Sequence, residues 1–342
     1  MKEKIIFFGT PDFAVPALEA LVQAGYDVVA VVTQPDKPVG RGLKMEAPAV
    51  KIAAQKFGLM VLQPISLNVV AEGFSLPNGG LKASATTPIK VFRELHADLG
   101  ICVAYGKIIP KEILSIFPRG ILNIHPSLLP KYRGPSPIQT AIRSGDEETG
   151  VTIMLLDEEM DHGPIATHIT YHISHITTGS KLSQALAKDG ARLLVDVLPK
   201  WLDGEIEAKE QNHSEATFTK MLEREDGRID WNKPAEEIEK MVRAYDAWPG
   251  TFTVWNGKRL KILRVSLLHP AIGCADNAEP GYVFSVRSLD SRGSLGMTPI
   301  TIGVNCNPGA IVLEELQLEG KKSMTGEEFL RGYPKFLHSI LA

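Results

Sequence analysis

Short, continuously apolar runs recur in the first part of this chain, and they constrain its fold more than any other feature. They lie within the predicted strands 4–8, 28–33, 98–105 and 120–124. Such runs are typical of strands buried on both faces of a parallel sheet. Between the first two, Thr10 and Pro11 can begin a helix whose apolar face covers 13–21, and Gly25 ends it. We therefore expect a βαβ opening and a doubly wound, mostly parallel, Rossmann-like α/β sheet.

Length and charge limit the possibilities further. The 342 residues are too many for one ordinary core, so two domains are expected. The formal net charge of -3 gives no global electrostatic case for nucleic acid, so any RNA contact must come from local patches. The first turn carries one glycine, Gly9, and not the GxGxxG fingerprint, which argues against a Rossmann dehydrogenase.

Cysteine usage and the N-terminus bear on the compartment. The three cysteines, Cys102, Cys274 and Cys306, are far apart and show no metal-ligand spacing, as expected in a reducing compartment. The apolar run at 5–8 is too short for a signal sequence or a membrane span, and nothing else approaches a membrane helix. We therefore expect a cytoplasmic protein that does not enter a membrane.

The first candidate site lies where the run at 120–124 ends. Asn123 and His125 are two residues apart, so a strand would place both side chains on the same side. Chemistry in an open α/β sheet sits where strands end and loops begin. An amide donor beside an imidazole suits a carbonyl that must take on negative charge. The alternative is a satisfied core histidine followed by a turn that Pro126 and Pro130 hold.

An acidic loop follows a further strand at 150–156. A carboxylate in such a loop becomes an acid/base candidate once it faces a histidine. Asp161 stands out because Gly163 and Pro164 break the chain just after it. A solvated acidic turn is the simpler interpretation for its neighbours Asp157, Glu158 and Glu159.

Three histidines, His168, His172 and His175, raise the question of a metal. The segment 165–176 alternates like a strand, which would put His168 and His172 on one face and His175 on the other. No cysteine is nearby, and the nearest acid is Asp161. We expect no metal site here.

A basic loop and an irregular stretch interrupt the predicted sheet. The loop 34–44 contains two prolines, two glycines and three cations. It is either a mobile surface connection or a basic arm that becomes ordered on a polyanion. Residues 66–87 lack periodicity and carry turn signals, which indicates a surface insertion.

The pattern changes after a polar stretch that begins at residue 205. Short strands alternate with turn signals, and Asn256-Gly257 predicts a type I′ hairpin. This arrangement predicts a small open β-barrel of the oligonucleotide-binding (OB) kind. The cations of that hairpin fall on two strand faces. Two interpretations of this hairpin therefore stay open, a solvated surface and an RNA contact. We expect a domain at 1–204, a linker at 205–223 and a second domain at 224–342.

Several motifs occur together in a fixed order along nearly the whole chain. They are Phe8-Gly9-Thr10-Pro11-Asp12-Phe13, Gln34-Pro35-Asp36-Lys37-Pro38 with Gly40-Arg41-Gly42, Val103-Ala104-Tyr105-Gly106, 123–130, Arg133-Gly134, 150–154 and Arg228-Ile229-Asp230-Trp231. Taken together they resemble the methionyl-tRNA formyltransferase family. The central motif is specific for enzymes that use 10-formyltetrahydrofolate, and the 34–44 loop with the second domain narrows the resemblance to the tRNA enzymes.

The resemblance implies a fold, a reaction and a set of site residues. The fold is a Rossmann-like catalytic domain, a linker and an open β-barrel that helps to hold tRNA. The reaction transfers the formyl group of 10-formyltetrahydrofolate to the α-amine of methionyl-initiator tRNA for translation initiation. Separately from the resemblance, we expect no metal and a monomeric protein. The implied catalytic residues are Asn123, His125 and Asp161. Those implied for folate are Ser127, Leu128, Leu129 and Pro130, and those for tRNA are Arg41 and Lys44.

These residues suggest a mechanism, and several rivals compete with it. Asn123 and a protonated His125 would stabilise the oxyanion of a tetrahedral intermediate. Asp161 would keep His125 charged and relay the amine proton. The rivals are formyltransferases that act on glycinamide ribonucleotide or a nucleotide-sugar amine, the hydrolase module of formyltetrahydrofolate dehydrogenase, and a non-catalytic RNA-binding protein.

Overall fold

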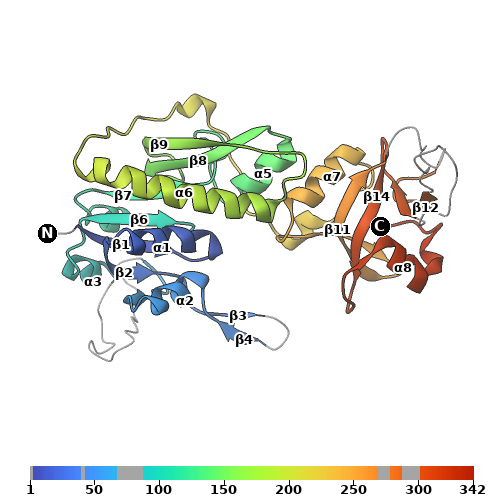
Figure 1. Cartoon of the computed structure of the whole chain (residues 1–342), viewed down its shortest axis with the longest axis horizontal. Coiled ribbons are helices and arrows are strands. Elements are labelled where there is room, and N and C mark those ends of the chain that lie inside the picture. The colour runs from blue at the N-terminus through green and yellow to red at the C-terminus, as the bar shows by residue number, and fades with distance from the viewer. Residues whose placement is uncertain (1–2, 40–42, 68–87, 269–277, 287–300) are drawn as a thin grey trace. The chain divides into compact units, whose positions relative to one another are not determined.

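The computed structural model describes the chain except for residues 1–2, 40–42, 68–87, 269–277 and 287–300 (Figure 1). The chain divides into two compact units. The first comprises Met1–Pro137, Glu148–His172 and Ser183–Thr219, and the second comprises Ile138–Glu147, Ile173–Leu182 and Lys220–Ala342. The polar stretch from residue 205 to 219 therefore packs as part of the first unit.

A seven-stranded sheet forms the centre of the first unit. Its order is β5-β2-β1-β6-β7-β8-β9. The strands are β1 (Lys4–Gly9), β2 (Asp27–Val32), β5 (Val61–Leu62), β6 (Leu99–Val103), β7 (Ile121–His125), β8 (Glu148–Leu155) and β9 (Ile165–His172). Pairing is parallel from β5 to β7 and antiparallel for β7 with β8 and β8 with β9. This confirms the predicted doubly wound, mostly parallel sheet.

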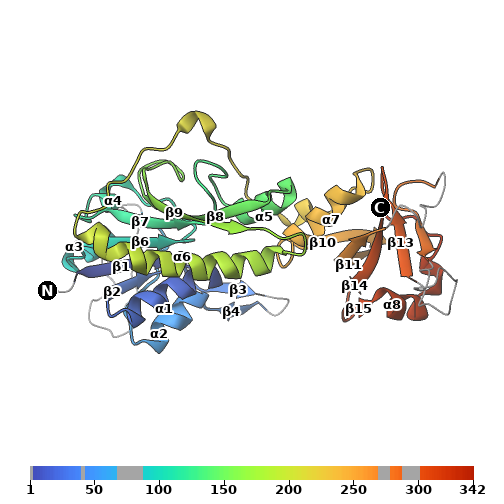
Figure 2. The same cartoon turned by 45° about the horizontal axis from the view of Figure 1, so that its top comes forward.

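Helices cover both faces of this sheet. They are α1 (Val15–Gln23), α2 (Ala49–Lys56), α3 (Pro88–Glu94), α4 (Lys111–Leu114) and α6 (Gly179–Leu202). The second unit contains α5 (Pro137–Ser144) apart from its first residue, and it also contains the start of α6. A Cβ on Gly190 of α6 would lie 2.8 Å from the Ile124 side chain, so α6 covers the face to which Ile124 points. Figures 1 and 2 both show α6 in front of the strands. Asn123 and His125 alternate with Ile124 and point to the opposite face.

Two local predictions for the first unit were wrong. Thr10 does not cap the first helix. Its hydroxyl donates instead to the Tyr105 carbonyl oxygen at 3.0 Å, and a 3-10 turn at Asp12–Ala14 precedes α1. The 34–44 segment is not all loop, because β3 (Lys37–Val39) and β4 (Lys44–Glu46) pair as an antiparallel hairpin. Residues 40–42 and 68–87 lie outside the described residues, so the expected surface insertion at 66–87 is untested there.

The second unit is built on an antiparallel sheet with the order β10-β11-β14-β13-β12, and β15 also pairs with β14. Its elements are α7 (Ala235–Ala244), β10 (Thr251–Trp255), β11 (Lys258–Leu267), β12 (Val283–Val286), β13 (Thr301–Asn305), β14 (Ala310–Leu318), β15 (Met324–Thr325) and α8 (Gly326–Gly332). Asn256 and Gly257 both have positive φ between β10 and β11, which confirms the predicted type I′ hairpin. Within the described residues β10 and β12 end the hydrogen-bonded order, so an OB-like barrel stays a prediction.

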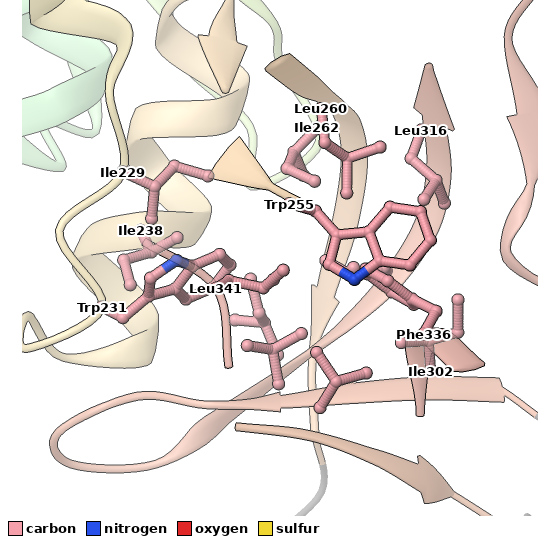
Figure 3. Close-up of a cluster of buried hydrophobic side chains, with 14 of the residues drawn as sticks. Ile229, Trp231, Ile238, Trp255, Leu260, Ile262, Ile302, Leu316, Phe336 and Leu341 are labelled. Atoms are coloured by element: carbon pink, nitrogen blue, oxygen red, sulfur yellow. The ribbon is translucent and has the colours of Figure 1, made fainter. Parts of the chain in front are cut away.

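Aromatic side chains fill the core of the second unit (Figure 3). The Trp255 ring packs edge-on against Phe336, with centroids 5.1 Å apart, and against Phe329 at 5.8 Å. Trp231 is also buried, and its indole N–H donates to the Thr253 hydroxyl at 3.1 Å. A buried indole N–H usually has such an acceptor, so the Thr253 hydroxyl accommodates Trp231 within this core.

No helix in the described part of the chain combines the length and the apolar character that crossing a bilayer requires.

Candidate active site

The end of β7 positions Asn123 and His125. β7 lies between β6 and β8, with Asn123 opposite Cys102 of β6 and His125 opposite Thr152 of β8. The two residues are 8% and 4% exposed. Within the described part of the chain, the Asn123 side-chain amide makes no hydrogen bond to another residue. A nearly buried amide without a protein partner can donate to a ligand oxygen.

The His125 ring is held from both sides. Its Nε2 lies 3.0 Å from the main-chain oxygen of Tyr132. A carbonyl oxygen only accepts, so Nε2 carries a proton. The other nitrogen, Nδ1, lies 3.5 Å from Oδ1 of Asp161. That distance is too long for a strong hydrogen bond, so a proton on Nδ1 is attracted to the carboxylate without being committed to it.

Asp161 reaches this position from the loop between β8 and β9. Because β8 runs antiparallel to β7, the loop starts near the beginning of β7 and must return along the sheet to meet His125. Asp161 has φ of 49°, in the left-handed region that few residues other than glycine adopt. Its Oδ2 accepts a hydrogen bond of 2.8 Å from the Gly134 N–H. The structure thus brings together the three residues predicted as catalytic.

The segment 132–134 joins the histidine to the carboxylate. The carbonyl of Tyr132 holds His125, and the N–H of Gly134 holds Asp161. Gly134 has φ of 106°, and a Cβ there would lie 2.8 Å from the main-chain oxygen of Thr219. Only glycine fits such a conformation and such a close approach. The sequence motif included Gly134 but gave it no role, and the single signal was a glycine next to an arginine.

The predicted folate motif is a loop that holds itself together. The Ser127 hydroxyl is fully buried and donates to the Lys131 carbonyl at 2.6 Å. The Thr152 hydroxyl donates to the Ser127 carbonyl at 2.7 Å and accepts from the Leu129 N–H at 3.2 Å. Ser127 and Leu129 are buried, whereas Leu128 and Pro130 are only partly so. The Ser127 side chain therefore fixes the shape of the loop.

Cys102 lies on the same side of the sheet, opposite Asn123. The pKa of its thiol is raised to about 12. Burial is the main cause, the Asp161 carboxylate adds to it, and a hydrogen bond with the Tyr105 backbone opposes it. The nucleophilic form of cysteine is the thiolate. Cys102 therefore stays protonated at neutral pH and offers no nucleophile beside the three residues.

The remaining predicted residues lie elsewhere or outside the described chain. Arg41 is among the residues that are not described, and Lys44 is exposed at the start of β4. The described residues contain no group of three or more metal-binding side chains. His168 and His172 do lie on β9, where His172 is 3.3 Å from Glu148, and His175 falls after the strand ends.

Comparison with known families identifies the family of this chain. The formyl transferase family matches residues 3–198, and the formyl transferase C-terminal domain matches residues 221–334. The chain therefore belongs to the formyl transferases. Within that family it belongs to the methionyl-tRNA formyltransferases. It is 44% identical to the methionyl-tRNA formyltransferase of Chloroflexus aurantiacus, over 96% of both chains, and 40% identical to that of Agathobacter rectalis, again over 96% of both.

Solved structures show the same fold at low sequence identity. HypX from Aquifex aeolicus, solved with tetrahydrofolic acid, has a TM-score of 0.63 at 16% identity, covering 98% of this chain and 48% of that one. An N-formyltransferase from Helicobacter canadensis, solved with folinic acid and dTDP-3-aminofucose, has a TM-score of 0.61 at 19% identity, covering 92% of this chain and 99% of that one. At such identities the likeness supports the fold alone.

Proposed function

We propose that this chain transfers the formyl group of 10-formyltetrahydrofolate to the α-amine of methionyl-initiator tRNA, which prepares that tRNA for translation initiation. Membership of the methionyl-tRNA formyltransferases supports the substrate pair. The observation that carries the chemistry is the placement of His125 Nδ1 3.5 Å from Asp161, beside an Asn123 amide without a partner among the described residues.

The first step is attack by the uncharged amine on the formyl carbon. A new C–N bond forms, and the formyl oxygen takes on negative charge. Asn123 donates through its amide, and His125 donates through Nδ1–H, which is not committed to Asp161 at 3.5 Å. Preorganised donors of this kind stabilise the developing oxyanion without reorganisation during the reaction.

Collapse of the intermediate breaks the bond between the formyl carbon and N10 of the folate. The attacking nitrogen loses a proton and N10 gains one, so the two transfers balance. While it is ionised, Asp161 stabilises protonated His125; it then accepts the amine proton, directly or through water, and passes it to N10 as the bond to the formyl carbon breaks. The Gly134 N–H, 2.8 Å from Oδ2, keeps one carboxylate oxygen fixed while the other faces the ring.

The other parts of the chain are assigned by the same proposal. Residues 1–204 form the catalytic domain, 205–223 the linker and 224–342 the tRNA-binding domain. Ser127, Leu128, Leu129 and Pro130 form the folate site, with Ser127 acting through the shape of the loop. Arg41, which the sequence places between β3 and β4, and Lys44, the first residue of β4, contact the acceptor end of the tRNA. The protein works as a monomer in the cytoplasm.

The base of that hairpin is well anchored, which supports its assignment to a large substrate. Asp36 accepts hydrogen bonds of 2.8 Å from Lys51 and from Gln63. The Gln63 amide also donates to the Gln34 carbonyl at 2.8 Å, and Gln34 donates to the Tyr105 carbonyl at 3.1 Å. These contacts connect the base of the hairpin to α2 and to the ends of β5 and β6.

The test compares acceptors under identical conditions. The purified protein is incubated with 10-formyltetrahydrofolate and either methionyl-initiator tRNA, glycinamide ribonucleotide or a dTDP-amino sugar. We expect transfer to the tRNA alone, and we expect Arg41→Ala to raise KM for the tRNA. Transfer to a small amine instead would overturn the assigned substrate, and folate turnover independent of tRNA would remove the role of the hairpin and the second domain.

A further inference from the structure

A buried polar pair connects the predicted linker to the active-site loops. Gln211 lies between the stretches that the two family domains match, and it is 5% exposed. Its partner Arg133 is 3% exposed. The Arg133 Nε and Nη2 atoms donate to Oε1 of Gln211 at 3.1 and 2.7 Å. Burying polar side chains of this kind costs free energy unless they are fully hydrogen-bonded. The hydrogen bonds between Arg133 and Gln211 therefore help to offset the cost of burying both side chains.

The amide nitrogen of Gln211 points to the catalytic loop. Its Nε2 donates to the main-chain oxygen of Asp161 at 3.0 Å and to that of Gly163 at 2.8 Å. Arg133 has only donors and carbonyl oxygens only accept, so the orientation of the amide follows from its partners. One side chain thus holds the backbone on both sides of residue 162.

A second linker residue contacts the same loop. The Nδ1 of His213 accepts from Arg133 Nη2 at 2.8 Å. The His213 ring stacks on that of His162, with centroids 4.1 Å apart and planes 4° apart. The linker therefore contacts three consecutive residues of the loop, at 161, 162 and 163. It is also tied to the segment that joins His125 and Asp161, because Arg133 N donates to Thr217 O at 2.8 Å.

We propose that Gln211 is a positioning residue for formyl transfer, which fixes the Asp161 carboxylate against His125 by holding the carbonyls of Asp161 and Gly163. The inference rests on the proposed function. The left-handed backbone at Asp161, with φ of 49°, is a conformation that surrounding contacts must maintain. The linker is thus a part of the active site as well as a connection between domains.

Gln211→Glu tests this with almost no change of shape. The new carboxylate keeps Arg133 as a partner, and as an ion pair, so the linker should stay in place. It loses both donated hydrogen bonds and sets an anionic oxygen against two carbonyl oxygens, which should displace the loop. A displacement of about 1 Å at a catalytic group can cost about 100-fold in rate. We expect kcat to fall about 100-fold, with KM for both substrates within about twofold.

The decisive measurement repeats the substitution in an Asp161→Asn background. A residue that acts through Asp161 should cost little once that carboxylate is gone, so Gln211→Glu should lower kcat by less than about threefold there. A merely structural role would lower kcat by the same factor in both backgrounds. Asn212→Ala is the matched control and should leave kcat unchanged, because among the described residues that neighbouring amide bonds only within 212–215.

Each outcome decides the question. Melting temperatures show whether the variants fold. If Gln211→Glu does not fold, Gln211→Met replaces it, because methionine has a similar length and lacks the amide. Wild-type kcat in either variant, or equal losses in both backgrounds, would overturn the positioning role while leaving the proposed function intact. A wild-type protein that does not formylate methionyl-tRNA would overturn the proposed function itself.

Discussion

Replacing Asp161 with asparagine changes which form of His125 the site stabilises. The Gly134 N–H requires an acceptor 2.8 Å away, so the amide oxygen should take the place of Oδ2. The amide nitrogen then occupies the place of Oδ1, which lies 3.5 Å from Nδ1 of His125. An N–H group there can donate to an unprotonated Nδ1, whereas it repels a protonated one. The variant should therefore favour the tautomer in which Nδ1 accepts, because the Nε2 proton remains bound to the Tyr132 carbonyl.

The size of the effect follows from the distance between the two groups. Opposite unit charges at this separation attract by about 4 kcal/mol at an effective dielectric constant of about 20. Because the Asp161 side chain is 15% exposed, water weakens that attraction further. Loss of the carboxylate that faces Nδ1 and accepts the amine proton should lower kcat by about 10²- to 10⁴-fold. The variant should stay folded, because the hydrogen bond from Gly134 is kept and the cost of desolvating the carboxylate disappears together with its attraction to His125.

Single-turnover formylation of methionyl-initiator tRNA, with folate affinity and melting temperature measured alongside, separates these effects. Asp157→Asn is the matched control, because that carboxylate lies in the same loop and pairs with His162 at 2.6 Å. We expect Asp161→Asn to bind folate almost as wild type does and to react slowly, and Asp157→Asn to react normally. A folded Asp161→Asn protein with kcat within threefold of wild type would refute the reasoning.

Three further substitutions probe other parts of the structure. Asn123→Ala removes an oxyanion donor and should lower kcat by about 10²- to 10³-fold with little change in melting temperature; an unchanged kcat would contradict this. Gly134→Ala sets a Cβ 2.8 Å from Thr219 O at φ of 106°, so unfolding in urea should show a loss of about 1–3 kcal/mol. The hydrogen bond from Gln63 holds the pKa of Asp36 below its ordinary value. The resulting stabilisation is complete above the unfolded-state pKa of about 4 and is lost as pH falls through the folded pKa, so the gap in melting temperature between wild type and Asp36→Asn should narrow in acid; a constant gap would refute it.

Local patterns predicted the elements that depend on local physics. The continuous apolar runs became β1, β2, β6 and β7, because a strand buried on both faces has no polar side. The Asn256-Gly257 pair became a type I′ hairpin, because both residues tolerate positive φ. The 34–44 segment was misjudged, since its two strands are only three residues long and carry a proline and charges that are typical of a loop.

The sequence predicted the relative placement of only those candidate-site residues that lie on one strand. Asn123 and His125 follow from the two-residue period of a single strand. Asp161 was a candidate from its loop, but nothing local showed that the loop returns along the sheet to His125. Gln211 lay in a polar stretch that resembled a linker, and only its burial against Arg133 shows that it contacts the catalytic loop.

The sequence by itself determined the fold class, the mostly parallel sheet and the pairing of an amide with an imidazole at one strand end. Those features depend on side-chain alternation and burial, which are written in neighbouring residues. Only the tertiary structure decided which nitrogen of His125 faces Asp161, which backbone groups hold the two, and that the linker supports them. The physical reason is that hydrogen bonds between distant loops depend on how the chain returns on itself, and no local pattern records that path.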